Sequence, residues 1–302
     1  MDVTPITPRT GPVVSAFTCT LASVHAYPIK SCGGVDLKQG LLIETGLEFD
    51  RAWMVVDRHG DMLTQREHPR MALVQCTFKG NELVLRAPGM LALHLRLDTV
   101  EQPTQAQVWN DRVKAYDMGA LAAQWFTDFL QPGAPGAGLR LVRFDPEHVR
   151  ACDREWTGTL PAQTAFADGY PLLVTNSASL HDLNQRLAAR GAAPVTMQRF
   201  RPNLVLEGLP AYDEDYTREL IIETADGEVE LRLVKPCSRC SIPNIDPATA
   251  GTSTDVADTL AHYRADPRVG GAVTFGMNAV VVRGIEFYLQ AGQAVRGQIA
   301  FA

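Results

Sequence analysis

Short segments in which apolar and polar residues alternate dominate the first hundred residues of the chain. This alternation is typical of β-strands that have one face in the core and the other in water. Turn residues separate the segments, and Gly60 in the stretch 57–61 suits a hairpin. Closely spaced strands of this kind predict a barrel or a sandwich. The predicted strands are 20–29, 35–44, 51–57, 71–78, 81–87 and 91–98.

Helical periodicity is confined to a few segments, which are 118–131, 177–190 and 255–266. The second follows the good N-cap residues Asn176 and Ser177 and stops at Gly191. An Asp-Gly turn at 226–227 lies between two further apolar runs. The expected fold class is therefore mainly β with a few helices, or α+β. The Pro- and Gly-rich stretch 130–138 is the best linker candidate.

Composition and charge narrow the class of protein. The chain has 302 residues and a net charge of −6, which argues against general nucleic-acid binding. It contains no run of about 18 apolar residues and no signal-peptide pattern, so we expect no membrane contact. The first ten residues are expected to form a loose tail. Six cysteines are too few for a disulfide scaffold in a chain of this length, which favours a reducing, cytoplasmic location.

Cationic residues stand near predicted strand ends in two stretches. In YPIKSCGG (27–34), Lys30 and Ser31 precede two glycines whose backbone amides can approach an anion closely. In FDRAW (49–53), Arg51 has the guanidinium geometry that suits phosphate. Each stretch alone is also compatible with an ordinary turn or a surface cation.

A third cationic stretch is QRFRPNLVLEG (198–208). Arg199 and Arg201 occupy alternate positions and point to the same side of an extended chain. Together with Asn203 they suit a guanidinium clamp for a phosphate or a polar polycyclic ligand. Salt bridging on a strand edge is the alternative interpretation.

The stretch KPCSRCSIPNIDPATAG (235–251) places Cys237 and Cys240 three positions apart. Structural zinc needs four ligands, and no second Cys/His pair matches this one. A redox dithiol should open a helix, whereas Pro243 and the Asp-Pro pair at 246–247 break any helix here. Two buried thiols remain an alternative, as does one thiolate that binds a metal carried by a cofactor. Nearby cations favour the thiolate form.

Blocks of this sequence resemble one protein family in the same order over roughly residues 20 to 300. The family is the MOSC superfamily, and in particular its branch with a MOSC N-terminal β-barrel domain, which includes the mitochondrial amidoxime reducing component and its bacterial relatives. The blocks are YPIKSCGG, GLEFDRAWMVVD, ADGYPLLVTNSASLHDLN, RFRPNLVLEG, KPCSRCSIPNIDPATAG and FGMN.

The resemblance implies a MOSC β-barrel plus a smaller N-terminal β-barrel-like domain. On this basis the chain divides into an N-terminal region, 20–140, and a cofactor-binding domain, 141–302. Within the first region, 20–51 is expected to pack on the cofactor domain, and about 52–140 is expected to be an insertion.

The resemblance also implies a molybdenum cofactor, a molybdenum-pyranopterin dithiolene, with the Cys240 thiolate as the protein ligand of the metal and Cys237 non-ligating. Asn278 falls where the mitochondrial members carry a tyrosine. Besides Cys240, the residues that match cofactor-contacting positions are Lys30, Ser31, Arg51, Asp168, Gly169, Tyr170, Arg201, Asn203, Ser238, Arg239 and Asn278.

The implied activity is reduction of small N-hydroxylated substrates, such as amidoximes, hydroxylamines and N-hydroxylated bases, from N–OH to N–H plus water. Because the chain ends without a cysteine-rich ferredoxin module, electrons are expected from a separate ferredoxin-like protein, flavoprotein or b-type cytochrome system. Asp246 is either a proton shuttle or a turn residue. A cofactor carrier or sulfur-transfer module is the alternative function. A thiol-redox protein with a Cys237–Cys240 disulfide is a third interpretation.

Overall fold

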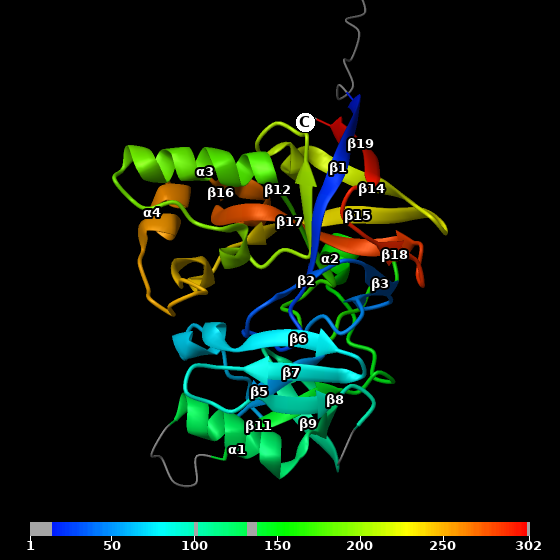
Figure 1. Cartoon of the computed structure of the whole chain (residues 1–302). Coiled ribbons are helices and arrows are strands. Elements are labelled where there is room, and N and C mark those ends of the chain that lie inside the picture. The colour runs from blue at the N-terminus through cyan, green and yellow to red at the C-terminus, as the bar shows by residue number, and fades with distance from the viewer. Residues whose placement is uncertain (1–13, 100–101, 132–137, 301–302) are drawn as a thin grey trace, which may run out of the picture.

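The computed structural model describes residues 14–99, 102–131 and 138–300 as two β-rich halves, one above the other in Figure 1. The upper half is a barrel in which the strand order is β12-β13-β1-β19-β14-β15-β17, and β12 also pairs with β17 to close the ring. Its strands are β1 (Val14–Ala26), β12 (Leu172–Asn176), β13 (Leu204–Glu207), β14 (Thr217–Thr224), β15 (Gly227–Ser238), β17 (Ala272–Arg283) and β19 (Ala294–Ala300).

The barrel interior follows from the alternation along its strands. In β15, for example, Val229, Leu231 and Leu233 are buried while the residues between them are more exposed. Gly276 has φ +78° and permits the closing contact, since a Cβ at this position would lie 2.7 Å from the Val174 carbonyl oxygen. The short strands β2 (Val35–Leu37), β3 (Gly40–Ile43), β4 (Gly46–Leu47), β16 (Ala265–Asp266) and β18 (Tyr288–Leu289) lie around it.

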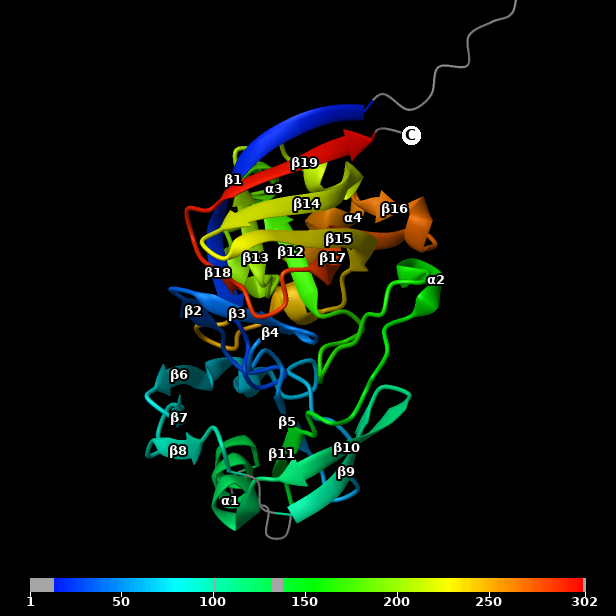
Figure 2. The ribbon, with the colours of Figure 1, turned by 90° about the vertical axis from the view of Figure 1, so that its right-hand side faces the viewer.

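The lower half contains two small sheets and one helix, seen from the side in Figure 2. The first sheet has the order β5-β11-β10-β9, and the second has the order β6-β7-β8. Helix α1 covers them and contributes Phe126 and Phe129 to a core that also holds Trp53. The elements are β5 (Trp53–Val56), β6 (Gln75–Lys79), β7 (Glu82–Arg86), β8 (Leu93–Arg96), β9 (Gln102–Val108), β10 (Asp111–Asp117), α1 (Gly119–Leu130) and β11 (Arg140–Phe144).

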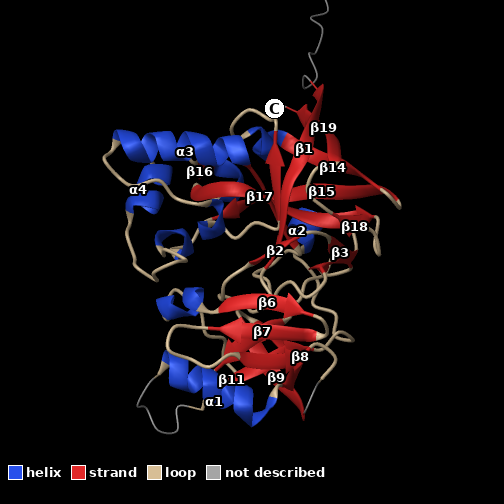
Figure 3. Ribbon diagram, in the orientation of Figure 1, coloured by secondary structure: helices blue, strands red, loops and turns tan. Residues whose placement is uncertain are grey.

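The other α-helices belong to the upper half (Figure 3), whereas the helical turn η1 lies in the lower half, where Met71 joins the core around Trp53. The Asn176 side chain caps α3 (Ser177–Ala189) by accepting from the Ala178 amide, and α3 packs against α4 (Asp255–Ala261). None of the helices within the described residues is long and apolar enough to cross a membrane. The remaining helical segments are α2 (Arg154–Thr157), η1 (Pro69–Leu73), η2 (Met197–Arg199), η3 (Asp213–Tyr216), η4 (Ile242–Asn244) and η5 (Pro267–Val269).

The predicted fold class is confirmed, and so are the helices expected at 118–131 and 177–190. The helix expected over 255–266 ends early, at Ala261, because Ala265 and Asp266 pair with β17. In the strand expected over 71–78, the first residues instead complete the helical turn η1, which begins at Pro69.

Three further predictions concern the linker, the N-terminal tail and the division into domains. The proposed linker 130–138 lies mostly outside the described residues, and the expected N-terminal tail lies wholly outside them. The sheet pairing joins β1 and β2 to the upper barrel, whereas β5 to β11 form the lower half. The division into domains at residue 140 stays a prediction.

Candidate functional site

A cavity lies between the two halves, and every residue predicted from the family resemblance to contact the cofactor or its metal lines it. Arg199 and Asp246 do not line it and instead pair with each other. The predicted residues come from the loop after β1, the Arg51 turn, the segments that precede β12 and β13, the end of β15 with the residues after it, and the middle of β17. The predicted lining residues are Lys30, Ser31, Arg51, Asp168, Gly169, Tyr170, Arg201, Asn203, Ser238, Arg239, Cys240 and Asn278. Arg66, Phe200, Cys237 and Ile242 also line it.

Two arginines lie over the buried ring of Tyr27 at one end of the cavity. The guanidinium carbon of Arg51 is 4.4 Å from the ring centroid and that of Arg201 is 4.3 Å from it. Burial, together with the charge of Arg51, lowers the pKa of Arg201 to about 10. One Arg201 nitrogen donates to the Cys32 carbonyl oxygen at 2.5 Å, but Nη2 is buried and has no partner. An anion would satisfy this nitrogen.

Arg51 is held in place by its neighbour Asp50 and by Asn203, which comes from a distant part of the chain. Its Nη1 donates to the Asp50 carboxylate at 2.6 and 2.8 Å and to Asn203 Oδ1 at 3.1 Å. The Asn203 amide also accepts from the Leu173 backbone and donates to the His25 carbonyl oxygen, which ties β12 to β1. The side chain of Asn203 therefore positions Arg51 between these strands.

The backbone is strained where these side chains meet. Ser31, Arg51 and Arg201 have φ values of 68°, 48° and 57°, a region that residues other than glycine rarely adopt. Such conformations cost about 1–3 kcal/mol each and concentrate at functional sites, where the surrounding structure enforces them. The strain therefore marks this end of the cavity as a binding site.

Lys30 forms a second anchor opposite the loop that follows β11. Its Nζ donates to the Phe166 carbonyl oxygen at 2.8 Å and to Asp168 Oδ1 at 2.5 Å. Burial lowers the pKa of Lys30, and Asp168 partly offsets this effect. Burial would raise the pKa of Asp168, but the charge and hydrogen bond of Lys30 hold it well below its usual range. Buried Arg150 fixes the same loop through the carbonyl oxygens of Ala165 and Ala167.

The two thiols of the 235–251 loop differ in their surroundings. Cys237 is partly buried, and its sulfur accepts from Arg239 Nη1 at 3.0 Å. Cys240 is exposed at the cavity. Arg239 is fixed by bonds from its backbone to Val273 and from Nη2 to Phe200, while its buried Nε has no partner. Both cysteines line the cavity, and Cys240 is the more exposed of the two.

Other predicted residues complete the wall or lie outside it. Asn278, on β17, donates to the Lys235 carbonyl oxygen at 3.3 Å. The hydroxyl of Tyr170 is buried without a partner, and burial raises its pKa. Asp246 does not line the cavity, because its Oδ1 caps the Ala248 amide and its Oδ2 pairs with Arg199. The geometry supports the turn interpretation of Asp246.

The donor set of the cavity fits an anionic ligand that brings its own metal. Cations outnumber acids along the wall, where Asp168 is the only acid among the lining residues. Buried donors of Arg201 and Arg239 lack partners. Across the described ranges, no group of three or more His, Cys, Asp or Glu side chains is placed to hold a metal ion. A metal could thus be held by one soft thiolate, Cys240, together with ligands from an organic group. The cations of the wall are Lys30, Arg51, Arg66, Arg201 and Arg239.

Three residues at or beside the cavity were missed at the sequence level. Tyr27 belongs to the YPIKSCGG block, but its role depends on Arg51 and Arg201 reaching it from later segments. Arg66 and Trp109 come from the lower half, in stretches without a motif. Only the folded chain brings them to the cavity.

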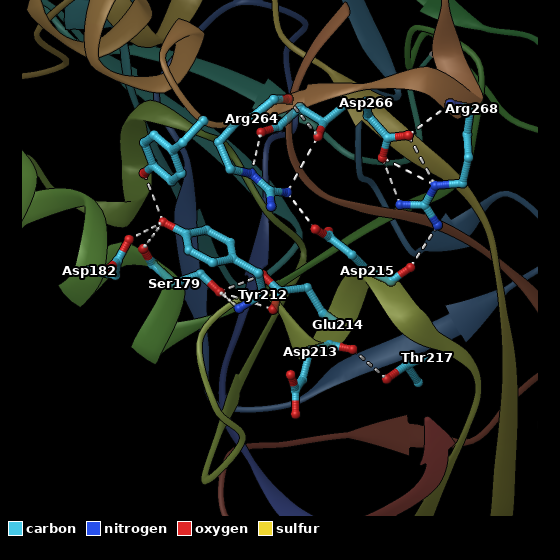
Figure 4. A network of polar contacts seen from close by, with 12 residues as sticks. Ser179, Asp182, Tyr212, Asp213, Glu214, Asp215, Thr217, Arg264, Asp266 and Arg268 are labelled. Carbon is cyan, nitrogen blue, oxygen red and sulfur yellow. Dashed lines mark hydrogen bonds and ion pairs between the residues drawn. The ribbon is translucent and has the colours of Figure 1, made fainter. Parts of the chain in front are cut away.

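A second cluster of buried charges lies in the upper half and is drawn in Figure 4; we call it the acidic network. Glu214 is fully buried, and its carboxylate accepts from Ser179 Oγ at 2.7 and 2.9 Å. Burial and the charge of Asp215 raise the pKa of Glu214 to about 7. Asp215 pairs with Arg264 at 2.5 Å. The acidic network consists of Asp182, Glu214, Asp215 and Asp266 with their partners.

Comparison with known proteins matches both halves of the chain. Residues 18–132 match the MOSC N-terminal beta barrel domain, and residues 161–296 match the MOSC domain. Human mitochondrial amidoxime reducing component 2 is 36% identical over 257 residues, which cover 81% of this chain and 72% of that protein. Human mitochondrial amidoxime-reducing component 1 is 36% identical with the same coverage. Zebrafish (Danio rerio) molybdenum cofactor sulfurase is 29% identical in the matching region, which covers 32% of the length of that protein.

Proposed function

The chain belongs to the MOSC proteins with a MOSC N-terminal β-barrel domain, and from this premise we propose that it is a molybdenum-cofactor-dependent reductase of N-hydroxylated compounds. The substrate class comprises amidoximes, hydroxylamines and N-hydroxylated bases. In the reaction the N–O bond breaks, two electrons and two protons are consumed, and N–H and water form. Two relatives at 36% identity are mitochondrial amidoxime reducing components, which supports this class.

One observation carries the proposal. Five cations converge on a single cavity of a protein with a net charge of −6, and they surround an exposed thiol. Buried guanidinium donors of Arg201 and Arg239 lack partners within the described residues. Because an unpaired buried donor costs about 1–3 kcal/mol, an anionic ligand that accepts from these donors would stabilise the arrangement.

The cofactor residues divide into two groups. Cys240 would supply the protein sulfur ligand of the molybdenum, since its thiol is exposed to the cavity. Arg51, Arg201 and Lys30 would bind the negatively charged phosphate end, and Arg239 would orient the Cys240 loop. When bound, the cofactor supplies the two-electron redox chemistry. The protein residues hold, orient and neutralise it.

We also propose the context in which the protein works. Each turnover consumes two electrons, so a separate electron donor such as a ferredoxin-like protein, a flavoprotein or a b-type cytochrome system must supply them. A cytoplasmic location is proposed as well. It is supported by the six cysteines, which are all free.

The test uses protein made in a molybdenum-replete host. Elemental analysis should find molybdenum bound, and the protein should reduce benzamidoxime with a chemical reductant. We expect Cys240→Ser to lower kcat more than 100-fold and to reduce the bound molybdenum. Cys237→Ser is the matched control and should keep the metal.

Unchanged activity in Cys240→Ser would reject Cys240 as the ligand. Tight cofactor binding without turnover in the parent protein would instead favour the carrier or sulfur-transfer function. This alternative has the weaker support, because the sulfurase match covers only 32% of that protein.

A further inference from the structure

The turn between β9 and β10 contains Trp109, a residue type that the backbone conformation of this turn disfavours. Val108 pairs with Asp111, so Trp109 and Asn110 form a two-residue hairpin connection. Trp109 has φ 53°, a conformation that such turns normally assign to Gly, Asn or Asp. A bulky aromatic residue is costly there. Local sequence rules are most often broken at functional positions.

Core packing does not explain Trp109 either, because the residue is 43% exposed. A single exposed apolar residue needs no explanation by itself, but a tryptophan that keeps part of its ring in solvent beside a cavity offers a surface for binding. Among the exposed large apolar residues of the described chain, Trp109 contacts the wall of the cavity. A ligand would explain the presence of a tryptophan at this strained and exposed position.

The position of the ring is fixed by three cavity residues. Trp109 Nε1 donates to Asp168 Oδ1 at 3.0 Å, and the Arg66 guanidinium carbon lies 4.6 Å from the ring centroid. The Lys30 ammonium lies 6.0 Å from the same centroid. In Figure 2 the β9–β10 hairpin extends from the lower half toward the upper one. The indole thus borders the mouth of the cavity and keeps part of its surface in solvent.

We propose that the Trp109 ring is the stacking surface for the aromatic part of the substrate, so that the protein selects aryl and heteroaryl N-hydroxylated compounds over aliphatic ones. The inference rests on the proposed function and names the substrate class within it. Stacking on an exposed aromatic face recognises any planar π-system and requires no specific hydrogen bond. Arg66 and Asp168 prevent the ring from rotating away, so little ordering is needed when a substrate binds.

The arrangement assigns selectivity to the lower half of the molecule. Cys240, Arg201 and Arg239 all come from the upper half, whereas Trp109 and Arg66 come from the lower half. Substrate preference can therefore change through the hairpin without any change in the residues proposed to hold the cofactor.

The test is a binding measurement on cofactor-loaded protein without reductant. Isothermal titration calorimetry compares benzamidoxime, which has an aryl ring, with acetamidoxime, which has a methyl group in its place. The parent protein should bind benzamidoxime at least tenfold more tightly. Trp109→Ala should abolish this preference while leaving the affinity for acetamidoxime within about twofold. Trp109→Phe keeps an aromatic face but lacks the N–H group that bonds Asp168, so it should retain most of the preference.

Each contrary outcome overturns the inference. These outcomes are a parent protein that prefers neither compound, a parent protein that binds neither, a preference that survives in Trp109→Ala, and a preference lost equally in Trp109→Phe. The last result would mean that the bond to Asp168, and not stacking, matters. Because no reductant is present, benzamidoxime binding through Trp109 without any later turnover would refute the proposed reductase and leave this inference intact.

Discussion

The cavity and the acidic network are both clusters of buried charge, and their charges are unbalanced in opposite directions. Cations are in excess in the cavity, where burial lowers the pKa values of Lys30 and Arg201. Carboxylates are in excess in the acidic network, where burial raises the pKa of Glu214 to about 7. Burial thus favours the neutral form of the group in excess in each cluster.

The two clusters differ in what can neutralise them. A proton on Glu214 removes one negative charge of the network, and Arg264 and Arg268 pair with Asp215 and Asp266. Arginine does not lose its proton under ordinary conditions, so the four arginines of the cavity stay charged even where Lys30 becomes neutral. An anion from outside would balance this remaining charge. Unbalanced charge alone therefore does not identify a binding site; charge that the protein cannot neutralise by itself does.

The largest expected effect comes from Glu214→Gln, which removes the titration of the acidic network. The folded pKa of Glu214 is raised from 4.5 to about 7, so its contribution to stability is complete below pH 4.5 and is lost as the pH rises through 7. At pH 8 the variant should be more stable by about 3 kcal/mol at most. Urea unfolding between pH 4.5 and 8 measures the difference. Parallel curves for parent and variant would contradict the raised pKa.

A somewhat smaller effect is expected from Arg201→Leu, which removes part of the positive charge of the cavity. Charge-assisted hydrogen bonds contribute about 1.5–3 kcal/mol, so affinity for a phosphate-bearing cofactor should fall about thirtyfold. Elemental analysis of molybdenum retained after dialysis measures this loss. Arg112→Leu is the control, since Arg112 is exposed on β10 and does not line the cavity. Equal molybdenum retention in the two variants would argue against Arg201 as a cofactor residue.

The smallest expected effect is that of Asn176→Ala. This variant removes an uncharged side chain and serves as a control for both the cavity and the acidic network. The Asn176 side chain caps α3 and donates to the Pro210 carbonyl oxygen at 2.7 Å. Its loss should destabilise the protein by about 1 kcal/mol, by the same amount at every pH and with or without cofactor. Urea unfolding at pH 5 and pH 8 measures both values. A pH-dependent loss would show that Asn176 is coupled to the acidic network.

The sequence predicted much of the site because its residues stand in short blocks with recognisable chemistry. Lys30 and Ser31 share one block, Arg201 and Asn203 another, and Arg239 and Cys240 a third. In each block the residue types themselves suggest an anion or a soft metal. The alternation of apolar residues likewise predicted the β-rich fold, since this periodicity is a local property of strands.

What the sequence did not predict depends on contacts between distant segments. The helix expected over 255–266 stops early because Ala265 finds a strand partner in Val273. Trp109, with Arg66 over its ring, meets Asp168 only in the folded chain, since Trp109 and Asp168 are 59 positions apart. The left-handed conformation of Arg51 is also enforced by distant groups, and no local turn residue announces it.

The pairing of β1 with β19 determines when, during synthesis, the barrel of the upper half can close. Val14 lies opposite Ala300, so the barrel joins the first described strand to the last one. A nascent chain that has not yet released β19 from the ribosome leaves one edge of β1 unpaired and the ring open. The barrel can therefore close only after β19 has left the ribosome.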